Sequence, residues 1–133
     1  MSGWKDAERQ VAKLLGGRRR VRINYSESCE DVYHTKYSIE VKYGKQVPKW
    51  IEKVRQPVII NSALVLFPLA SGSFASATEI KRVKIKFLLA GMVQAHAYNI
   101  GKVPMLCMKP VGYRGIIGCL YLLDYLDSEF CKK

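Results

Sequence analysis

Apolar residues recur with two different periods in the first fifty positions. Between residues 4 and 15 they fall at Trp4, Ala7, Val11 and Leu15, and this spacing predicts an amphipathic helix. Ser2 can cap its start, and the following glycine pair at 16–17 can end it. Three strands are predicted after this helix. Apolar and polar residues alternate over 21–25, and segments 31–33 and 37–43 are rich in β-branched and aromatic residues.

The second part of the chain predicts a short basic helix at 49–56, a long helix from Thr78 to about Asn99, and strands at 104–108 and 116–123. This order predicts an α/β fold with a central mixed β-sheet flanked by helices. A chain of 133 residues has the length of one domain, so 1–133 is interpreted as a single unit. Residues 58–78 fit a hairpin, a strand and loop, or an apolar surface for a partner, and we treat them as an insert.

The excess of basic residues indicates which kind of partner the protein binds. The chain has 22 Lys and Arg against 11 Asp and Glu, a formal net charge of +11. Such a surface predicts a polyanionic partner, DNA or RNA, because it binds by displacing condensed counterions. An anionic membrane fits less well, since the basic residues are spread along the chain instead of lining one helix. Charge alone does not separate a nuclease from a passive binder.

The cysteines and the apolar stretches favour a cytoplasmic protein without a membrane anchor. The four cysteines, Cys29, Cys107, Cys119 and Cys131, have no C-x-x-C spacing and no paired histidines nearby. Reduced thiols are therefore expected instead of a zinc site. The N-terminal segment is charged and unlike a signal peptide. The longest apolar stretch, 58–70, contains polar residues and a proline and is too short to cross a bilayer.

Three acids and one lysine are the candidates for chemistry. Glu8 falls on the edge of the first helix's apolar stripe, next to Trp4 and Val11. Glu40 and Lys42 are two apart in a strand, so they project from one face. Asp31 opens the preceding strand and can lie across from Glu40. Each has a plain structural alternative: an ion pair for Glu8, Glu40 and Lys42, and a turn position for Asp31.

Two carboxylates with a lysine at one edge suit a Mg²⁺ or Mn²⁺ site, because like charges repel unless a cation lies between them. Such an ion can polarise a scissile phosphate and lower the pKa of an attacking water. A lysine can orient that water or neutralise developing charge. The pattern therefore predicts metal-dependent hydrolysis of phosphodiester bonds.

The order of helix with Glu8, then Asp31, then Glu40-Val41-Lys42 resembles the PD-(D/E)XK nuclease superfamily, in particular its small archaeal Holliday junction resolvases. The likeness is clearest from Gly3 to about Trp50. It implies a restriction-endonuclease-like core, metal binding by Glu8, Asp31 and Glu40, and Lys42 as the catalytic lysine. It also implies a homodimer that cuts branched DNA. The chain departs from the pattern at Glu30, where proline is common, and at 58–77, a stretch without a counterpart in a minimal resolvase.

A second likeness concerns the long predicted helix. Gln94 and Tyr98 are four residues apart, in line with Ile80, Val83 and Phe87 on the side expected to face inward. The pair resembles the Gln-x-x-x-Tyr motif of RecB-type members, which implies that Gln94 supports catalysis and that Tyr98 contacts DNA. A glutamine at the core edge and a packing tyrosine are the alternative.

Two basic clusters flank the candidate acids and are expected to contact phosphates. One follows the first helix and one follows the strand with Lys42: Arg18, Arg19, Arg20 and Arg22, then Lys45, Lys49 and Lys53. A structure-specific endonuclease is the leading interpretation. A restriction-like or RecB-like nuclease is the alternative within the enzyme class, and a non-catalytic nucleic-acid-binding protein is the alternative outside it.

Overall fold

The computed structural model describes residues 3–19, 30–69 and 77–131. Ser2, Arg20, Arg22 and the strand predicted at 21–25 lie outside these ranges. The helices are α1 (Gly3–Leu15), the 3₁₀ helix η1 (Lys49–Lys53), α2 (Lys86–Tyr98) and α3 (Leu122–Leu126). The strands are β1 (Arg18–Arg19), β2 (Val32–Tyr33), β3 (Tyr37–Gly44), β4 (Val58–Ile60), β5 (Leu64–Pro68), β6 (Thr78–Ile80), β7 (Val103–Pro110) and β8 (Ile117–Tyr121).

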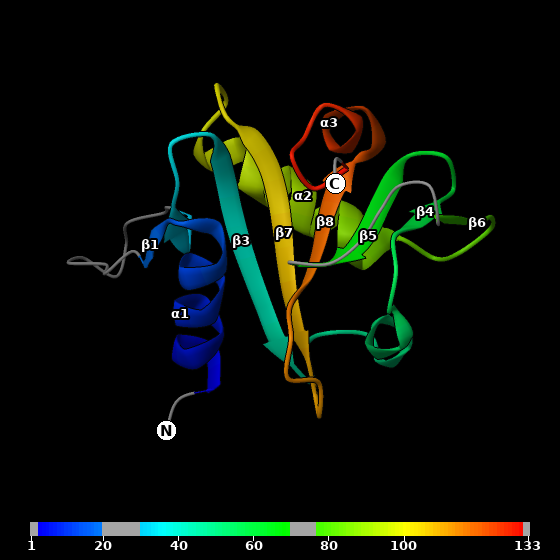
Figure 1. The fold of residues 1–133 in the computed structure, drawn as a ribbon, viewed down its shortest axis with the longest axis horizontal. Coiled ribbons are helices and arrows are strands. Elements are labelled where there is room, and N and C mark those ends of the chain that lie inside the picture. Colours follow the sequence, from blue (N-terminus) through cyan, green and yellow to red (C-terminus); the bar gives the residue numbers. More distant parts are fainter. Residues whose placement is uncertain (1–2, 20–29, 70–76, 132–133) are drawn as a thin grey trace.

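All described strands belong to one mixed sheet with the order β1-β2-β3-β7-β8-β5-β4-β6 (Figure 1). The longest pairing is the parallel one between β3 and β7, which runs in register from Tyr37 opposite Val103 to Gly44 opposite Pro110. The pairs β2–β3, β7–β8 and β8–β5 are antiparallel. The predicted α/β class with a central mixed sheet flanked by helices is confirmed.

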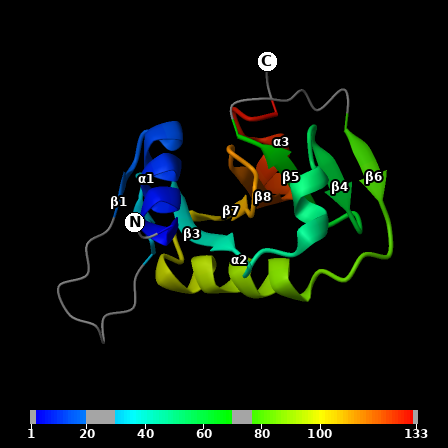
Figure 2. The same ribbon diagram turned by 90° about the horizontal axis from the view of Figure 1, so that it is seen from below.

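Helices cover both faces of the sheet, with α1 on one side and α2 on the other (Figure 2). Alternate residues of each central strand therefore enter different cores. Ile39 of β3 and Met105 of β7 belong to the same core as Val11 of α1, whereas Leu106 of β7 belongs to a second core with Met92 of α2. Both faces of β3 and β7 are buried, as expected for the parallel part of a sheet.

The elements around the candidate acids follow the sequence pattern closely. Helix α1 ends at Leu15 and is followed by Gly16 with φ of 72°, a left-handed conformation that glycine adopts without a steric penalty. Strands β2 and β3 form the expected antiparallel pair, and β7 and β8 lie where strands were predicted. The basic helix expected at 49–56 is shorter, a 3₁₀ helix that ends at Lys53.

The prediction of one helix from Thr78 to about Asn99 is wrong in its first part. Thr78–Ile80 forms β6, which pairs in parallel with β4, and α2 begins only at Lys86. Between them Arg82 has φ of 64°, which interrupts any regular helix. Val83, Ile85 and Phe87 alternate with polar or basic residues, a period that favours extended chain over helix.

Residues 58–68 form the hairpin that was one of the three interpretations. Strands β4 and β5 pair antiparallel, and β5 pairs with β8. Every residue of β5 is buried within this chain, so its apolar side chains extend the core and are not exposed to a partner. The short helix α3 was not predicted. Within the described ranges, no helix is long and apolar enough to cross a membrane.

Candidate functional site

Strand β3 carries three polar side chains on the face that α2 covers. Ser38 lies on that face, because its hydroxyl donates a 2.5 Å hydrogen bond to the carbonyl of Ala95 in α2. Glu40 and Lys42 follow at intervals of two, so they share this face. Glu40 is buried, and Lys42, nearer the open end of the strand, is half-buried. The sequence pattern therefore placed both residues on one face, as predicted.

Asp31 is held against the edge of β3 by two hydrogen bonds. Its backbone amide donates to the carbonyl of Ile39 at 3.0 Å, and its Oδ2 accepts from the amide of Val41 at 2.9 Å. This second bond exists because β2 begins only at Val32. The carboxylate therefore occupies the place along β3 where a longer β2 would have supplied a backbone carbonyl.

Asp31 and Glu40 are close enough to perturb each other. Burial, together with the hydrogen bond and the charge of Asp31, raises the pKa of Glu40 to about 9, although Lys42 and the Val41 amide oppose the shift. Within the described residues, Oε2 of Glu40 is also a buried polar atom without a hydrogen-bond partner. Such an atom carries a desolvation cost that a proton or a cation can relieve.

Lys42 is a cation that lies beside Glu40. Its Nζ lies 4.0 Å from Oε2 of Glu40, which is at the limit of an ion pair and beyond the length of a hydrogen bond. The side chain is 26% exposed and that of Glu40 is 4% exposed. The ammonium thus lies between the buried acids and solvent, where it can meet a group arriving from outside.

Glu8 has a different neighbourhood. It is buried on α1, and its Oε1 accepts a 2.8 Å hydrogen bond from Nε of Arg19 in β1. The guanidinium of Arg19 also lies 5.4 Å from the ring centre of Trp4. Across residues 3–19, 30–69 and 77–131, no three His, Cys, Asp or Glu side chains are gathered as a metal-binding group. The structure brings Asp31, Glu40 and Lys42 together, and it places Glu8 with Arg19.

The predicted inward orientation of Gln94 is wrong. The buried side of α2 consists of Leu88, Gly91, Met92 and Ala95, and Gln94 is exposed on the opposite side. The proposed pair does form, since Nε2 of Gln94 donates to the hydroxyl of Tyr98 at 2.7 Å. The error came from the helix start, because counting from Ile80 chose the wrong phase for a helix that begins at Lys86.

The basic residues that were predicted to contact phosphates fall into two groups. Arg18 lies over the ring of Tyr33 at 5.2 Å, and Arg19 is engaged by Glu8. Arg19 therefore has an ion-pair partner within the protein, whereas Arg18 is exposed and its charge reaches solvent. Lys45, Lys49 and Lys53 are all exposed. They line cavities beyond the end of β3, and none forms an ion pair with another described residue.

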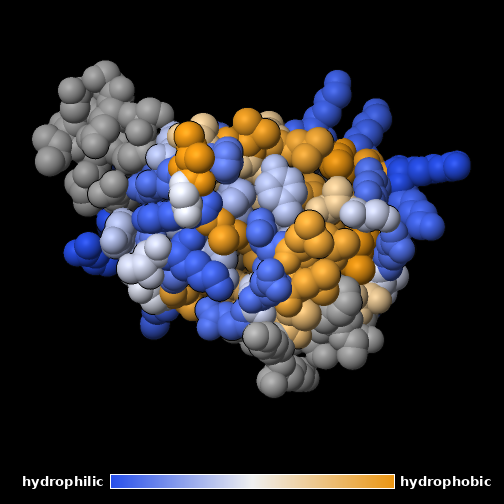
Figure 3. Space-filling model, turned by 90° about the horizontal axis from the view of Figure 1, so that it is seen from above, coloured by the Kyte–Doolittle hydropathy of each residue, from blue (hydrophilic) through white to orange (hydrophobic). Residues whose placement is uncertain are grey.

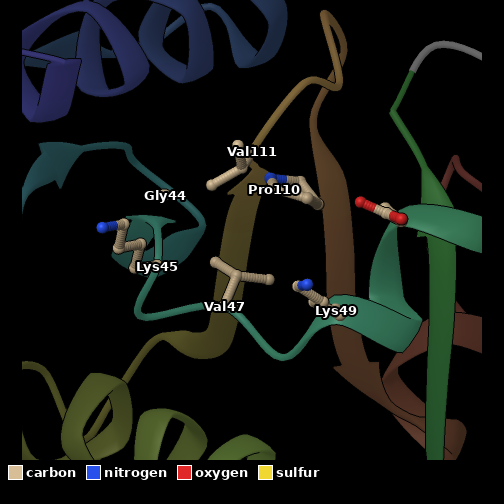
Figure 4. A pocket seen from close by; sticks show the side chains of 7 residues that line it. Gly44, Lys45, Val47, Lys49, Pro110 and Val111 are labelled. Carbon is tan, nitrogen blue, oxygen red and sulfur yellow. The ribbon is translucent and has the colours of Figure 1, made fainter.

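The larger cavity, about 470 Å³, lies where β3 and β7 end and where η1 begins. Pro110 and Val111 face Val47 and Lys49 across it, and Lys45 lies to one side (Figure 4). A second cavity of about 310 Å³ is its neighbour, since Glu52 and Val111 line both. Its other lining residues are Lys53, Arg55, Gly112 and Tyr113.

Sequence reasoning missed two polar groups near the acids. Glu30 is buried and accepts a hydrogen bond from the side-chain amide of Asn99, which also donates to Ser38 at 3.3 Å. These contacts join the end of α2 to the start of β2 and to β3. No periodicity or spacing connects residues 30, 38 and 99, so the sequence offered no signal for the network.

Comparisons with protein-family models, with curated proteins and with solved structures find no match for this chain. The function of the protein is therefore inferred from the geometry around Asp31, Glu40 and Lys42.

Proposed function

We propose that this protein is a metal-dependent endodeoxyribonuclease whose centre is formed by Asp31, Glu40 and Lys42. The observation that carries the proposal is the buried Oε2 of Glu40, which has no hydrogen-bond partner among the described residues and lies next to a second carboxylate. A protein interior does not retain two adjacent acids without a compensating cation or proton. A hard divalent cation, Mg²⁺ or Mn²⁺, is the partner that carboxylate oxygens prefer.

The residues present fit such an ion. The Asp31 carboxylate is fixed by the Val41 amide through Oδ2, and Glu40 has an oxygen free of hydrogen bonds. When bound between them, the ion would polarise a phosphate oxygen and lower the pKa of a water ligand. Lys42, at the solvent side of the pair, would orient that water or neutralise charge that develops on the phosphate.

Glu8 enters this proposal conditionally. The resemblance to PD-(D/E)XK nucleases assigns it as a third metal ligand, but its Oε1 accepts a hydrogen bond from Arg19. A carboxylate has two oxygens, so ligation of a metal through Oε2 would leave the contact with Arg19 in place. A role in which Glu8 acts through Arg19 or a bridging water is compatible with the present geometry.

DNA is the proposed substrate because of the net charge of +11 and the exposed lysines beyond the end of β3. Figure 3 shows both hydrophilic and apolar areas on the face that it views. The resemblance adds a preference for branched DNA such as a four-way junction and action as a homodimer, and the cysteine pattern and the N-terminal segment add a cytoplasmic location. These finer assignments are part of the proposal.

A second candidate is a non-catalytic nucleic-acid-binding protein. The contact between Arg19 and Glu8 favours it, because an acid held by a structural ion pair is not held for a metal. In that case Asp31 and Glu40 would share a proton.

Cleavage assays separate the two candidates. Labelled duplex and a four-way junction of the same sequences are incubated with the protein in Mg²⁺, in Mn²⁺ and in EDTA. Metal-dependent cutting is expected, and Glu40→Ala should abolish it while leaving DNA binding largely unchanged. Glu129→Ala removes an exposed acid and serves as the charge-matched control. A wild-type protein that binds both substrates and cuts neither would support the passive binder.

A further inference from the structure

The two cavities beyond the end of β3 are neighbours that share Glu52 and Val111, and together we call them the η1 groove. It is lined by Lys45, Lys49, Lys53, Arg55 and Tyr113 together with Glu52, Val47 and the turn residues Pro110 to Gly112. We propose that the η1 groove binds an unpaired DNA strand next to the reacting phosphate. The position of that phosphate rests on the proposed function, but strand binding does not.

The charge of the η1 groove fits a phosphate backbone. Its lining residues include four basic side chains and one acidic side chain, Glu52. Among the described residues, Lys45, Lys49 and Lys53 make no ion pair, so their charges are available to a ligand. A single strand carries one phosphate per nucleotide, and grooves of this sign follow such a backbone without reading its sequence.

The shape of the groove favours an exposed base over a paired one. The larger cavity has apolar walls formed by Val47, Pro110 and Val111, and its volume of about 470 Å³ is within the range of small-molecule sites. Val111 is 61% exposed, although it is a large apolar residue at the mouth of this cavity. A base in a duplex is stacked and paired, so only an unpaired nucleotide can enter.

Tyr113 and Arg55 supply a flat surface in the neighbouring cavity. The Arg55 guanidinium lies 4.8 Å from the centre of the Tyr113 ring. Its Nη1 donates hydrogen bonds to the carbonyls of Glu52 and Val54, which hold it in place. Aromatic rings and guanidinium planes are the surfaces on which proteins stack unpaired bases.

The groove also lies in the right place for the proposed chemistry. Lys42 and Gly44 are two residues apart on β3 and lie on the same face. At roughly 3.3 Å per residue, the groove begins about 7 Å beyond Lys42. A strand whose phosphate lies at Lys42 therefore reaches the groove with its next nucleotides. This predicts substrates in which duplex gives way to a single strand, as at a flap, a fork or an opened branch point.

Binding is measured in EDTA by fluorescence anisotropy, with the Glu40→Gln protein as the background so that nothing is cut. The probes are a labelled single-stranded oligonucleotide and the blunt duplex of the same sequence. Lys49→Ala with Lys53→Ala should weaken single-strand binding roughly tenfold. Lys84→Ala with Lys86→Ala removes the same charge from exposed positions outside the groove and should weaken it less than threefold.

A second pair of variants tests stacking. Tyr113→Ala should weaken single-strand binding by roughly tenfold and duplex binding by less than twofold, whereas Tyr113→Phe should retain both. Circular dichroism and thermal unfolding verify that each variant folds. Equal losses from the two lysine pairs, or equal effects of Tyr113→Ala on both probes, would overturn the groove assignment. A wild-type protein that shows the expected binding pattern but cuts no DNA would refute the proposed function alone.

Discussion

The backbone amide of Val41 donates a 2.9 Å hydrogen bond to Oδ2 of Asp31. Val41 is the residue between Glu40 and Lys42, so this bond fixes the carboxylate beside both. The orientation of Asp31 therefore does not depend on a bound ligand. A preorganised acid of this kind reduces the reorganisation that ligand binding would require.

The stability of the protein should fall as pH rises. Glu40 has a pKa of about 9 in the folded state, above its ordinary value of 4.5, so between these values the folded chain holds a proton that the unfolded chain releases. Stability is then full below the ordinary pKa and is lost as pH approaches 9. We expect the Tm in EDTA to drop between pH 5 and pH 9, by on the order of 5 °C more in the wild type than in Glu40→Gln. Equal drops in the two proteins would contradict the raised pKa.

A divalent cation should reverse this loss. Mn²⁺ or Mg²⁺ competes with the proton for the two carboxylates, so millimolar metal at pH 8 should raise the Tm of the wild type by several degrees. Glu40→Gln and Asp31→Asn should show little response. Glu129→Gln, which changes an exposed acid, is expected to respond like the wild type. A metal response that survives in both Glu40→Gln and Asp31→Asn would place the ion elsewhere.

Two substitutions of Asp31 separate its hydrogen bond from its charge. Asp31→Asn keeps an oxygen that can accept from Val41 and removes the negative charge beside Glu40. Asp31→Ala removes both. The pKa of Glu40, followed by NMR titration in EDTA, should fall below about 9 in Asp31→Asn, because that charge helps to raise it. Only Asp31→Ala should also leave the Val41 amide without its partner, which costs about 1–3 kcal/mol of unfolding free energy if the amide stays buried.

The contact between Arg19 and Glu8 should contribute measurably to stability. The side chains are 21% and 9% exposed, so Arg19→Ala leaves a largely buried carboxylate without its cation. We expect a loss of about 2 kcal/mol in denaturant unfolding. The double variant Arg19→Ala with Glu8→Gln should be more stable than Arg19→Ala alone. If Glu8 is a metal ligand in the active state, Arg19→Ala should in addition tighten metal binding.

Gly17 should not tolerate a side chain. A Cβ at this position would lie 2.4 Å from the backbone oxygen of Tyr33 in β2, so the pairing of β1 with β2 would have to move. Gly17→Ala is expected to cost at least about 2 kcal/mol. Gly101→Ala is the matched control, because a Cβ there meets nothing within 4 Å. A Gly17→Ala protein with wild-type stability would show that β1 can shift freely.

Much of the candidate site could be predicted from local sequence. The two-residue period fixed the shared face of Glu40 and Lys42, and the apolar stripe of α1 placed Glu8 at its buried edge. Both inferences depend only on the geometry of one element. The approach of Asp31 to Glu40 could also be predicted, because a short turn joins β2 to β3 and so places the two strands side by side.

The features of the site that could not be predicted depend on contacts between different elements of the fold. The phase of α2 was misjudged because β6 forms by pairing with β4, and tertiary pairing overrides a local helical pattern. Arg19 could not be identified as the partner of Glu8, because the contact depends on how the turn at Gly16-Gly17 directs β1 back along α1. The η1 groove arises from η1 and the β7–β8 turn, which meet only in the folded chain.

The parallel pairing of β3 with β7 has a consequence for biosynthesis. Chain segment 45–102 separates the two strands, so the strand with Glu40 and Lys42 leaves the ribosome well before its neighbour is made. Until β7 arrives, Glu40 stays hydrated and titrates as an ordinary glutamate. Contacts of such long sequence separation also form late and slowly in folding. A nascent chain that already carries both acids therefore lacks the buried pair, and any chemistry that needs it is delayed until β7 has been made.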